Sequence, residues 1–355
     1  MDFDGVARET MAARRTRSRI ADVAAEAGVS TATVDRVLNR RADVRPATAQ
    51  RVLRAAARLE YLPQAELWRS LQPPPMELAF LLPTGTNRYL RMLGDTIGRA
   101  ADALLPFNVR CRVHYIDSFD PARVAEALLR HGRRAKGIAF MALEHPLVRE
   151  AVDALVERDV HVITLISDLS QSRRAAYVGM DNRAAGRTAG SLMGRFIGPR
   201  SGPVAMIAGS LRYRGHEDRE TGFLHLMQEA YPALRVVGVR EGRDDADANH
   251  RLARTLLRQH PDLVGLYNIG GGADGIGRAL KEAKSERPVV VIAHGLTPDT
   301  RALLIDGTLD AVINQHPQTM LLSCVRIFCN LRDGRGATAG VEPIRISVVL
   351  RENLP

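Results

Sequence analysis

Cysteine is scarce in this 355-residue sequence, which contains only Cys111, Cys324 and Cys329. Their number is odd and their spacing matches no metal-ligand motif, so neither a disulfide framework nor a zinc site is expected. We interpret them as buried thiols of a protein that works in a reducing compartment.

Long apolar runs are absent as well. The N-terminal stretch MDFDGVARETMAARRTRSR carries charges but lacks the apolar core of a signal peptide. No later stretch approaches the roughly 20 apolar residues that a membrane span needs. The sequence therefore predicts a cytoplasmic protein without a membrane partner.

Common catalytic motifs are also missing, since there is no GxSxG elbow, no HExxH helix and no phosphate-binding loop. The glycine-rich stretch NIGGGADGIG (268–277) lacks the GxGxxG spacing and a lysine, so its glycines are expected to shape a loop rather than to hold a nucleotide. The ten histidines are dispersed along the chain. We predict a protein that is not an enzyme, with no catalytic residues, no metal site and no cofactor.

Positive charge is present and unevenly distributed. The formal net charge is +10, and residues 14–58 hold eleven arginines against four acidic residues, a net of +7. A localised positive charge favours an anionic partner. With 45% hydrophobic and 25% charged residues, the chain is also long enough for two or three folded domains.

Composition divides the chain into four parts. Residues 1–17 are expected to form a basic arm, and residues 18–62 a compact helical unit. The stretch PQAELWRSLQPPP (63–75) has prolines at both ends and is predicted to be a linker. Residues 76–355 alternate short aliphatic runs with amphipathic stretches, a pattern that is typical of an α/β domain.

Ten aliphatic runs are predicted to be strands of parallel sheets covered by helices on both faces. They are LAFLLP (78–83), VRCRVHYI (109–116), GIAFMA (137–142), VHVITLI (160–166), PVAMIAG (203–209), LRVVGV (234–239), LVGLYN (263–268), VVVIA (289–293), DAVIN (310–314) and IRISVVL (344–350). Two such series predict two doubly wound lobes with a cleft between them. Ligands bind beyond the carboxyl ends of strands in such sheets, so polar residues there are candidate site residues.

The helical unit has the pattern of a three-helix core. In IADVAAEAGVSTATVDRVLN (20–39), the apolar residues recur at helical spacing, Gly28 can end a first helix and Ser30 can cap a second. A third helix is expected to begin at Pro46. The start of the second helix presents small polar residues, which suits either a base-reading helix or an ordinary helical hairpin with a solvated basic face.

The stretch RIADVAAEAGVSTATVDRVLNRRADVRPATAQRVLRAAARLEYLP resembles the DNA-binding headpiece of the lactose-repressor (LacI) family over about 45 residues. The resemblance implies an all-α helix-turn-helix headpiece that binds a near-palindromic, double-stranded operator as a homodimer, with further pairing of dimers left open. It implies base-reading roles for Thr31, Ala32 and Arg36. It implies phosphate or positioning contacts for Ser30, Thr33 and Asn39.

Arg36 is the strongest base-reading candidate because its planar fork can pair with guanine, with a phosphate contact as the alternative. Two residues depart from the family pattern. Asp35 replaces a serine, and its carboxylate would repel phosphate unless it pairs with an arginine or accepts a hydrogen bond from cytosine. Arg45 replaces the usual small cap before Pro46, which is expected to weaken the start of that helix by about 1 kcal/mol.

The linker sequence WRSLQ resembles the family's hinge helix. The resemblance implies that Leu71 wedges into the minor groove at the operator centre. Trp68 stands where a small residue is usual, and we expect it to pack at a dimer contact.

Residues 76–355 resemble the periplasmic sugar-binding proteins, a two-lobed type I fold, most clearly in YVGMDNRAAGRTAG (177–190) and DRETGF (218–223). The resemblance and the strand ends imply a set of effector-binding residues, namely Asn87, Tyr89, Asp168, Arg219, Asn268 and Gln315. Amides, a carboxylate, an arginine and an aromatic ring suit a sugar, a polyol or a related polar effector. His294 and Gly295 stand where the family has an acidic residue, so either His294 substitutes for it or the ligand differs from a simple sugar.

These expectations combine into one hypothesis. The chain is predicted to be a dimeric transcription regulator, acting as a repressor, in which a small effector in the cleft changes operator affinity. The effector could act as inducer or as corepressor. The alternative is a solute-binding protein of a transport system, which would share the larger fold but should carry an export signal and no headpiece.

Overall fold

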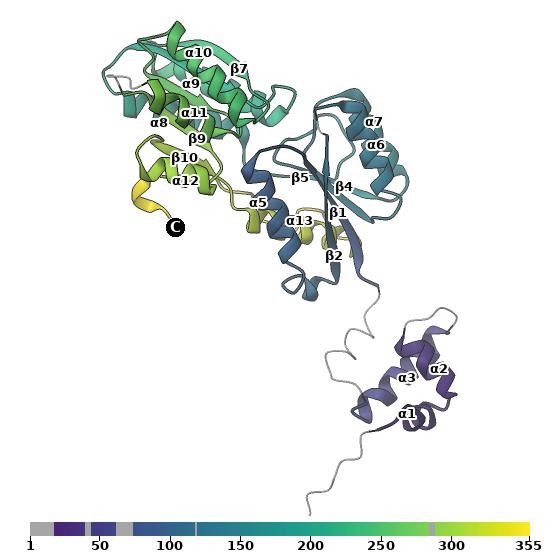
Figure 1. Cartoon of the computed structure of the whole chain (residues 1–355). Helices are drawn as coiled ribbons and strands as arrows, with labels where there is room; N and C mark the ends of the chain where they lie inside the picture. Colours follow the sequence, from purple (N-terminus) through teal and green to yellow (C-terminus); the bar gives the residue numbers. More distant parts are fainter. Residues whose placement is uncertain (1–17, 40–43, 62–73, 118, 284–287) are drawn as a thin grey trace, which may run out of the picture. The chain divides into compact units, whose positions relative to one another are not determined.

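The computed structural model describes residues 18–39, 44–61, 74–117, 119–283 and 288–355. The chain divides into two compact units, residues 1–75 and 76–355 (Figure 1). The predicted basic arm, together with Trp68 and Leu71 of the predicted hinge, lies outside the described residues.

The described part of the first unit contains three helices, α1 (Ile20–Ala27), α2 (Thr31–Leu38) and α3 (Pro46–Arg58). Gly28 ends α1 in the left-handed conformation, with φ 63°, which glycine adopts without a side-chain clash. The helices enclose a small apolar core that contains Val23, Val34 and Val52, all fully buried. The apolar spacing of the sequence therefore corresponds to the observed packing.

Helix α3 begins without a side-chain cap, as its sequence predicts. Arg45 occupies the N-cap position and makes no capping hydrogen bond, whereas Pro46 fills the first turn. Pro46 suits that position because its missing N–H would have no partner within the helix. The Arg45 carbonyl accepts from the Thr48 and Ala49 N–H groups, but the Arg45 side chain caps no N–H group of the first turn.

The larger unit contains two sheets, each in its own lobe (Figure 1). The first lobe has the strand order β2-β1-β3-β4-β5, and every pairing in it is parallel. Its strands are β1 (Met76–Pro83), β2 (Val109–Ile116), β3 (Gly137–Phe140), β4 (His161–Leu165) and β5 (Ala176–Val178). Strand β5 was not predicted, because three residues next to a chain crossing give too short a pattern.

The second lobe has the order β11-β10-β9-β8-β6-β7. Its strands are β6 (Gly202–Ala208), β7 (Leu234–Glu241), β8 (Gly265–Asn268), β9 (Val290–His294), β10 (Ala311–Asn314) and β11 (Ser347–Val349). All ten predicted strands are present, but the expectation of wholly parallel sheets was wrong at β11. This edge strand pairs antiparallel to β10, because the chain reaches it from the first lobe and not by a helical crossover on the same sheet.

Helices cover both faces of each sheet. In the first lobe, α6 (Pro121–His131) and α7 (Pro146–Glu157) cover one face, and α5 (Arg88–Arg99) and α13 (Pro317–Arg332) the other. In the second lobe, α10 (Ala246–Gln259), α11 (Ala273–Ala283) and α12 (Pro298–Ile305) face α8 (Asn182–Ile197) and α9 (Arg214–Ala230) across the sheet. Two short 3-10 helices span Leu105–Phe107 and Arg351–Asn353. None of the described helices combines the length and apolarity of a membrane span.

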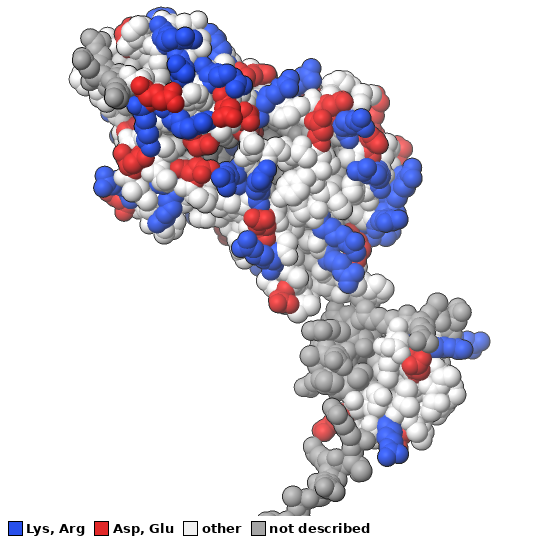
Figure 2. All heavy atoms as spheres, viewed as in Figure 1, with Lys and Arg blue, Asp and Glu red and all other residues white. Residues whose placement is uncertain are grey.

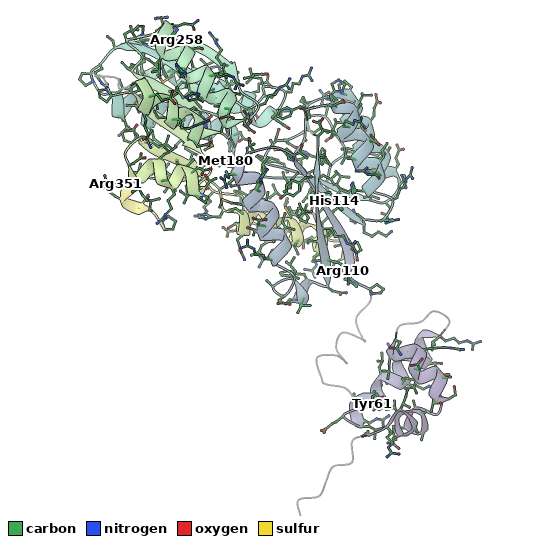
Figure 3. The ribbon with its side chains drawn as sticks, viewed as in Figure 1. Tyr61, Arg110, His114, Met180, Arg258 and Arg351 are labelled. Carbon is green, nitrogen blue, oxygen red and sulfur yellow. The ribbon has the colours of Figure 1, made fainter. Side chains whose placement is uncertain are left out.

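The chain crosses between the lobes three times, after β5, after β10 and after α13. The first two crossings are joined by a hydrogen bond in which the Met180 backbone N–H donates to Gln315 Oε1 over 3.0 Å. Figure 3 shows Met180 at the junction of the two lobes. Movement of one lobe against the other therefore involves these two bonded segments as well as the third crossing after α13.

The uncapped start of α3 yields a stability prediction. Replacing Arg45 by serine supplies a side-chain acceptor for the first-turn N–H groups and should raise the stability of the first unit by about 1 kcal/mol. Hydrogen exchange of the α1–α3 amides in the whole chain would measure it. Ser30→Ala, which removes the observed cap of α2, should shift the same amides by a similar amount in the opposite direction. Unchanged protection in Arg45→Ser would contradict the role given to the cap.

Candidate functional site

The N-terminal end of α2 forms the candidate DNA-reading surface. Ser30 caps the helix, and its Oγ accepts a hydrogen bond from the Thr33 N–H over 3.2 Å. Thr31, Ala32 and Arg36 are exposed, while Val34 and Val37 hold the helix in the core. Small side chains at a helix N-terminus allow close approach to base edges and phosphates.

The other two predicted positioning residues are already engaged within the chain. Thr33 Oγ1 lies 2.9 Å from Ser30 Oγ, which leaves Thr33 half-buried. Asn39 Nδ2 donates to Asp35 Oδ1 over 2.7 Å. Asp35 is therefore hydrogen-bonded to a neighbouring amide, which is neutral and does not itself balance the charge of the carboxylate. A phosphate contact by Asn39 would have to share or replace this bond.

A cavity lies between the lobes of the larger unit, at the carboxyl ends of strands from both sheets. It encloses about 50 Å³, room for a few water molecules at roughly 10–15 Å³ each. Polar and apolar side chains line it. They are Asn87, Tyr89, Leu90, Met141, Ile166, Met180, His216, Arg219, Asp244, Gly270, Gly271, His294, Gly295, Ile313 and Gln315.

Five of the predicted effector-binding residues line this cavity: Asn87, Tyr89, Arg219, His294 and Gln315. The two others, Asp168 and Asn268, do not. Asp168 pairs with Arg174 and accepts from Thr164 Oγ1 over 2.6 Å and from the Leu169 N–H over 2.8 Å. Burial raises the pKa of Asp168, but these hydrogen bonds outweigh it, and the net shift is downward.

Asn268 is fully buried beside the cavity rather than on its wall. Its Nδ2 donates to the carbonyls of Gly270 at 3.1 Å and Gly271 at 3.2 Å, so it shapes the glycine-rich loop after β8. This position agrees with the expected structural role of those glycines. Its Oδ1 is buried without a hydrogen-bond partner in the described part of the chain.

The lobes are closed upon each other. Asn87 Nδ2 of the first lobe donates to Asp244 Oδ2 of the second over 3.0 Å, and Thr86 Oγ1 donates to the Asp244 carbonyl over 3.3 Å. An ion pair between Arg88 of the first lobe and Asp299 of the second, 3.1 Å apart, also joins the lobes. A ligand larger than a few waters therefore requires these contacts to open.

Arg219 is the central charge of the site. It is 5% exposed, its Nε donates to Asn182 Oδ1 and its Nη1 donates to the Ile269 carbonyl, both over 2.8 Å. Burial lowers the pKa of Arg219, with nearby Tyr267 and other groups opposing the shift. Two of its nitrogens are thus fixed by the protein, and the residue lines the cavity.

Two buried histidines face this arginine. His294 Nε2 lies 2.7 Å from the Tyr267 hydroxyl, and its Nδ1 has no hydrogen-bond partner among the described residues. His216 Nδ1 lies 3.0 Å from the Ser210 carbonyl. Burial first, then Arg219 and His216, lower the pKa of His294, and burial lowers that of His216 although Asp244 opposes it. Both imidazoles are neutral near neutral pH.

Asp244 is a cavity residue that the sequence reasoning missed. It is 6% exposed, has φ 57°, and its Oδ1 accepts from the Gly271 N–H over 2.7 Å. The rule of polar residues after a strand, applied to RDDAD after β7, would have found it. The site thus contains one carboxylate, supplied from a different strand end than the acidic position the family pattern uses. No cluster of metal-ligating residues occurs in the part of the chain that the structure describes.

Comparison with known protein families assigns both units. Residues 19–64 match the model of bacterial regulatory proteins, lacI family, and residues 78–336 match the periplasmic binding protein domain. The chain belongs to the lacI family of bacterial regulatory proteins. Its helical unit is the family's helix-turn-helix, and its larger unit is a periplasmic binding protein domain.

Individual lacI-family relatives agree. The chain is 26% identical to the HTH-type transcriptional repressor PurR of Erwinia tasmaniensis over 69% of this chain and 70% of that protein. It is 28% identical to catabolite control protein A of Streptococcus mutans over 56% of this chain and 59% of that protein. Among solved structures, a glucose-galactose binding protein of Geobacillus stearothermophilus has a TM-score of 0.71 at 23% identity, over 80% of this chain and all of that one. The structural likeness shows the two-lobed fold.

The neutral buried histidines predict a pH-dependent stability. The unfolded chain protonates histidine below a pKa of about 6.5, whereas folded His216 and His294 resist protonation, so stability should fall as pH drops below that value. Each histidine contributes at most about 1.4 kcal/mol per pH unit. Thermal unfolding from neutral to mildly acidic pH should show a flatter slope in His294→Asn. Replacing the exposed His225 by asparagine is the control, and an equal change in both variants would contradict this account.

The close approach of α8 to α9 gives a second prediction. A Cβ at Gly186 would lie 2.0 Å from the Arg219 carbonyl oxygen, which is backbone and cannot swing away. Gly186→Ala should therefore push α9 outward and destabilise the larger unit by about 1–3 kcal/mol. Gly98→Ala on the exposed side of α5, where nothing lies within 4 Å of the new Cβ, is the matched control. Chemical denaturation should separate the two, and equal stability would refute the close packing.

Proposed function

We propose that this chain is a transcriptional repressor that binds a palindromic operator as a homodimer and that responds to a small polar effector bound between its lobes. The observation that carries the proposal is the combination of two features in one chain. One is a helix-turn-helix whose second helix exposes its N-terminal end, and the other is a closed cleft built around the buried Arg219. Because the target is DNA, we assign its site of action to the cytoplasm.

The DNA contact is proposed to centre on α2. Thr31 and Ala32 stand at the exposed start of the helix, and Arg36 follows one turn later with its fork free to meet a base edge. Ser30 and Thr33 would position the helix through phosphates, and the Asp35–Asn39 pair would hold the carboxylate away from the backbone of the duplex. Leu71 is retained as the proposed minor-groove wedge.

The effector is proposed to be a neutral, polyhydroxylated molecule. The site offers an arginine nitrogen, the carboxylate of Asp244, the amide of Asn87 and the partnerless Nδ1 of His294, which together can donate to and accept from hydroxyl groups. Tyr89 supplies an aromatic ring at the cavity wall, although its hydroxyl already donates to the Gln315 carbonyl over 3.1 Å. The structural relatives include a solute binding protein of Burkholderia graminis in complex with D-arabinose, which supports this ligand class.

Control of DNA binding is proposed to follow from lobe closure. An effector that fits the closed cleft stabilises closure only by the difference between its affinities for the closed and open forms, typically worth 1–3 kcal/mol. Closure turns one lobe about the crossings joined by Met180 and Gln315. The paired subunits would sense that rotation through their first lobes and change the order of the linker that precedes Met76.

Removing the Arg36 side chain tests the DNA-reading assignment. Arg36→Ala should weaken binding to the selected operator by about 1–3 kcal/mol and spare binding to random duplex. Fluorescence anisotropy at several salt concentrations would measure both, since phosphate contacts set the salt slope. Equal losses on operator and random DNA would reduce Arg36 to a phosphate contact.

Removing the Arg219 side chain tests the sensor. Arg219→Ala should abolish the response of operator binding to the effector while leaving ligand-free operator affinity unchanged. Calorimetric screening of sugars, polyols and sugar acids against the whole chain would first identify the effector. Replacing the exposed Arg195 by alanine controls for loss of charge. If Arg219→Ala unfolds the larger unit, as judged by circular dichroism, the residue is structural and the assignment fails.

A further inference from the structure

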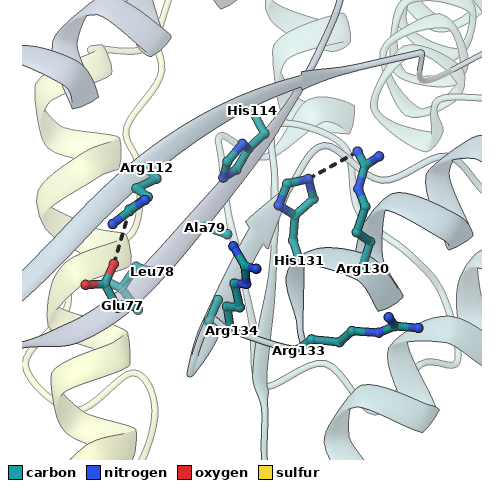
Figure 4. Close-up of a pocket in the computed structure, with 10 residues that line it drawn as sticks. Glu77, Leu78, Ala79, Arg112, His114, Arg130, His131, Arg133 and Arg134 are labelled. Carbon is teal, nitrogen blue, oxygen red and sulfur yellow. Dashed lines mark hydrogen bonds and ion pairs between the residues drawn. The ribbon is translucent and has the colours of Figure 1, made fainter.

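A second hollow, larger than the inter-lobe cavity, lies away from that cleft. It lies on the first lobe, between the strands β1 and β2 and the C-terminal end of α6 (Figure 4). Its volume is about 600 Å³, which falls within the range of small-molecule sites, roughly 300–1,000 Å³. Leu78 and Ala79 of β1 contribute an apolar part of the wall.

Positive charge dominates the wall of this hollow. Arg112 comes from β2, Arg130 from the end of α6, and Arg133 and Arg134 from the turn that leads to β3. The only carboxylate among the lining residues is Glu77, and it is already shared by Arg110 at 3.0 Å and Arg112 at 3.3 Å. Lining arginines therefore exceed the charge that Glu77 can balance.

Two of these arginines are uncommitted. The side chains of Arg133 and Arg134 are exposed and form no ion pair or hydrogen bond with any residue that the structure describes. Elsewhere on the visible face of the larger unit, Lys and Arg are interspersed with Asp and Glu (Figure 2). Planar guanidinium groups that line one hollow can recognise phosphate oxygens, often through paired hydrogen bonds.

A pair of histidines completes the wall. The rings of His114 on β2 and His131 on α6 lie 3.9 Å apart between centroids, and His131 Nε2 is 3.4 Å from an Arg130 nitrogen. Figure 3 shows His114 and Arg110 on the same strand. Burial, His114 and Arg130 lower the pKa of His131 to about 4, and burial with Arg112 and Arg130 lowers that of His114. Both rings are therefore neutral in the free protein and have the capacity to gain protons.

We propose that this hollow is a second ligand site, which binds a small anion that carries phosphate groups. The arginines supply the fixed charge, and the concave shape favours a compact ligand over an extended surface. The hollow is at the end of the first sheet where β1 begins, and so at the opposite end from the effector cleft. Residue 76 opens that strand directly after the linker, so a ligand here would bind close in sequence to the connection with the DNA-binding unit.

Proton uptake should accompany binding. The groups that face the two rings are Arg110 and Arg112 on β2, Glu77 on β1, Arg130 on α6, and Arg133 and Arg134 in the following turn. Their net positive charge disfavours the protonated form of the two histidines, whereas the negative charge of a bound dianion would favour it. Protonation of the histidines is then favoured in the complex, so affinity should increase as pH falls from neutral toward about 5.

Calorimetric titration of the whole chain with inorganic pyrophosphate tests the site. We expect measurable binding to the unmodified chain and a loss of at least about tenfold in the double variant Arg133→Ala/Arg134→Ala, since each exposed arginine can contribute a charge-assisted hydrogen bond. The matched control, Arg195→Ala/Arg235→Ala, removes the same charge from exposed positions of the second lobe and should change affinity less than twofold. Equal losses in the two double variants, or no binding to the unmodified chain, would overturn the proposal.

Two further arms separate the ligand class. Sulfate, whose charge is constant over this pH range, should bind more tightly at mildly acidic pH, and His114→Asn/His131→Asn should remove that dependence. Duplex DNA should bind the Arg133→Ala/Arg134→Ala variant as tightly as the unmodified chain. If DNA affinity falls instead while pyrophosphate binding is unaffected, the arginines belong to a nucleic-acid surface and the small-anion site is refuted.

Discussion

The larger unit depends on how closely α8 and α9 approach each other beneath Arg219. The backbone of α9 passes over Gly186, and the backbone of α8 passes over Gly222, where an added Cβ would lie 2.1 Å from the Arg183 carbonyl oxygen. This contact fixes the position of the Arg219 backbone relative to α8, and so the point from which its side chain extends. From there its nitrogens reach Asn182 on the same helix pair and the Ile269 carbonyl after β8. A buried guanidinium is costly unless its hydrogen bonds are satisfied, so the site is stable only while all three elements keep this register.

Closure of the lobes builds on that frame. Asn182 also donates to the Ile166 carbonyl of the first lobe over 3.0 Å, and the Gly215 N–H donates to Ser167 Oγ over 3.2 Å. The arginine is thus held by a residue that itself touches the opposite lobe. A ligand that bonds to Arg219 and His294 would therefore be connected to both lobes through hydrogen bonds. The Arg88–Asp299 pair between the lobes contributes little to closure, because solvent screens such partly exposed pairs.

Much of this architecture could be predicted from sequence, and the failures have physical causes. Apolar periodicity located the helical core around Val23, Val34 and Val52 and all ten predicted strands. Polar residues that follow a strand, such as Asn87 after β1, line the cleft as predicted, because the carboxyl ends of the parallel strands meet there. The prediction that Asp168 lines the cleft was wrong, because Arg174 of the same chain segment forms an ion pair with its carboxylate. Asp244 was missed because the strand-end rule was not applied after β7. The basic hollow was missed because its side chains come from separate elements that no local pattern brings together.

The central claim is that the state of the cleft controls operator binding, and locking the cleft tests it most directly. Thr86 Oγ1 lies 3.4 Å from Asp245 Oδ2 across the lobes, so Thr86→Cys/Asp245→Cys places a short thiol cross-linker there once Cys111, Cys324 and Cys329 have been replaced by alanine. The operator is the tightest duplex selected from a random pool. Cross-linking without any effector should change its affinity by at least about fivefold relative to the same variant blocked with a monofunctional reagent. Identical affinities of the locked and blocked proteins would contradict the account.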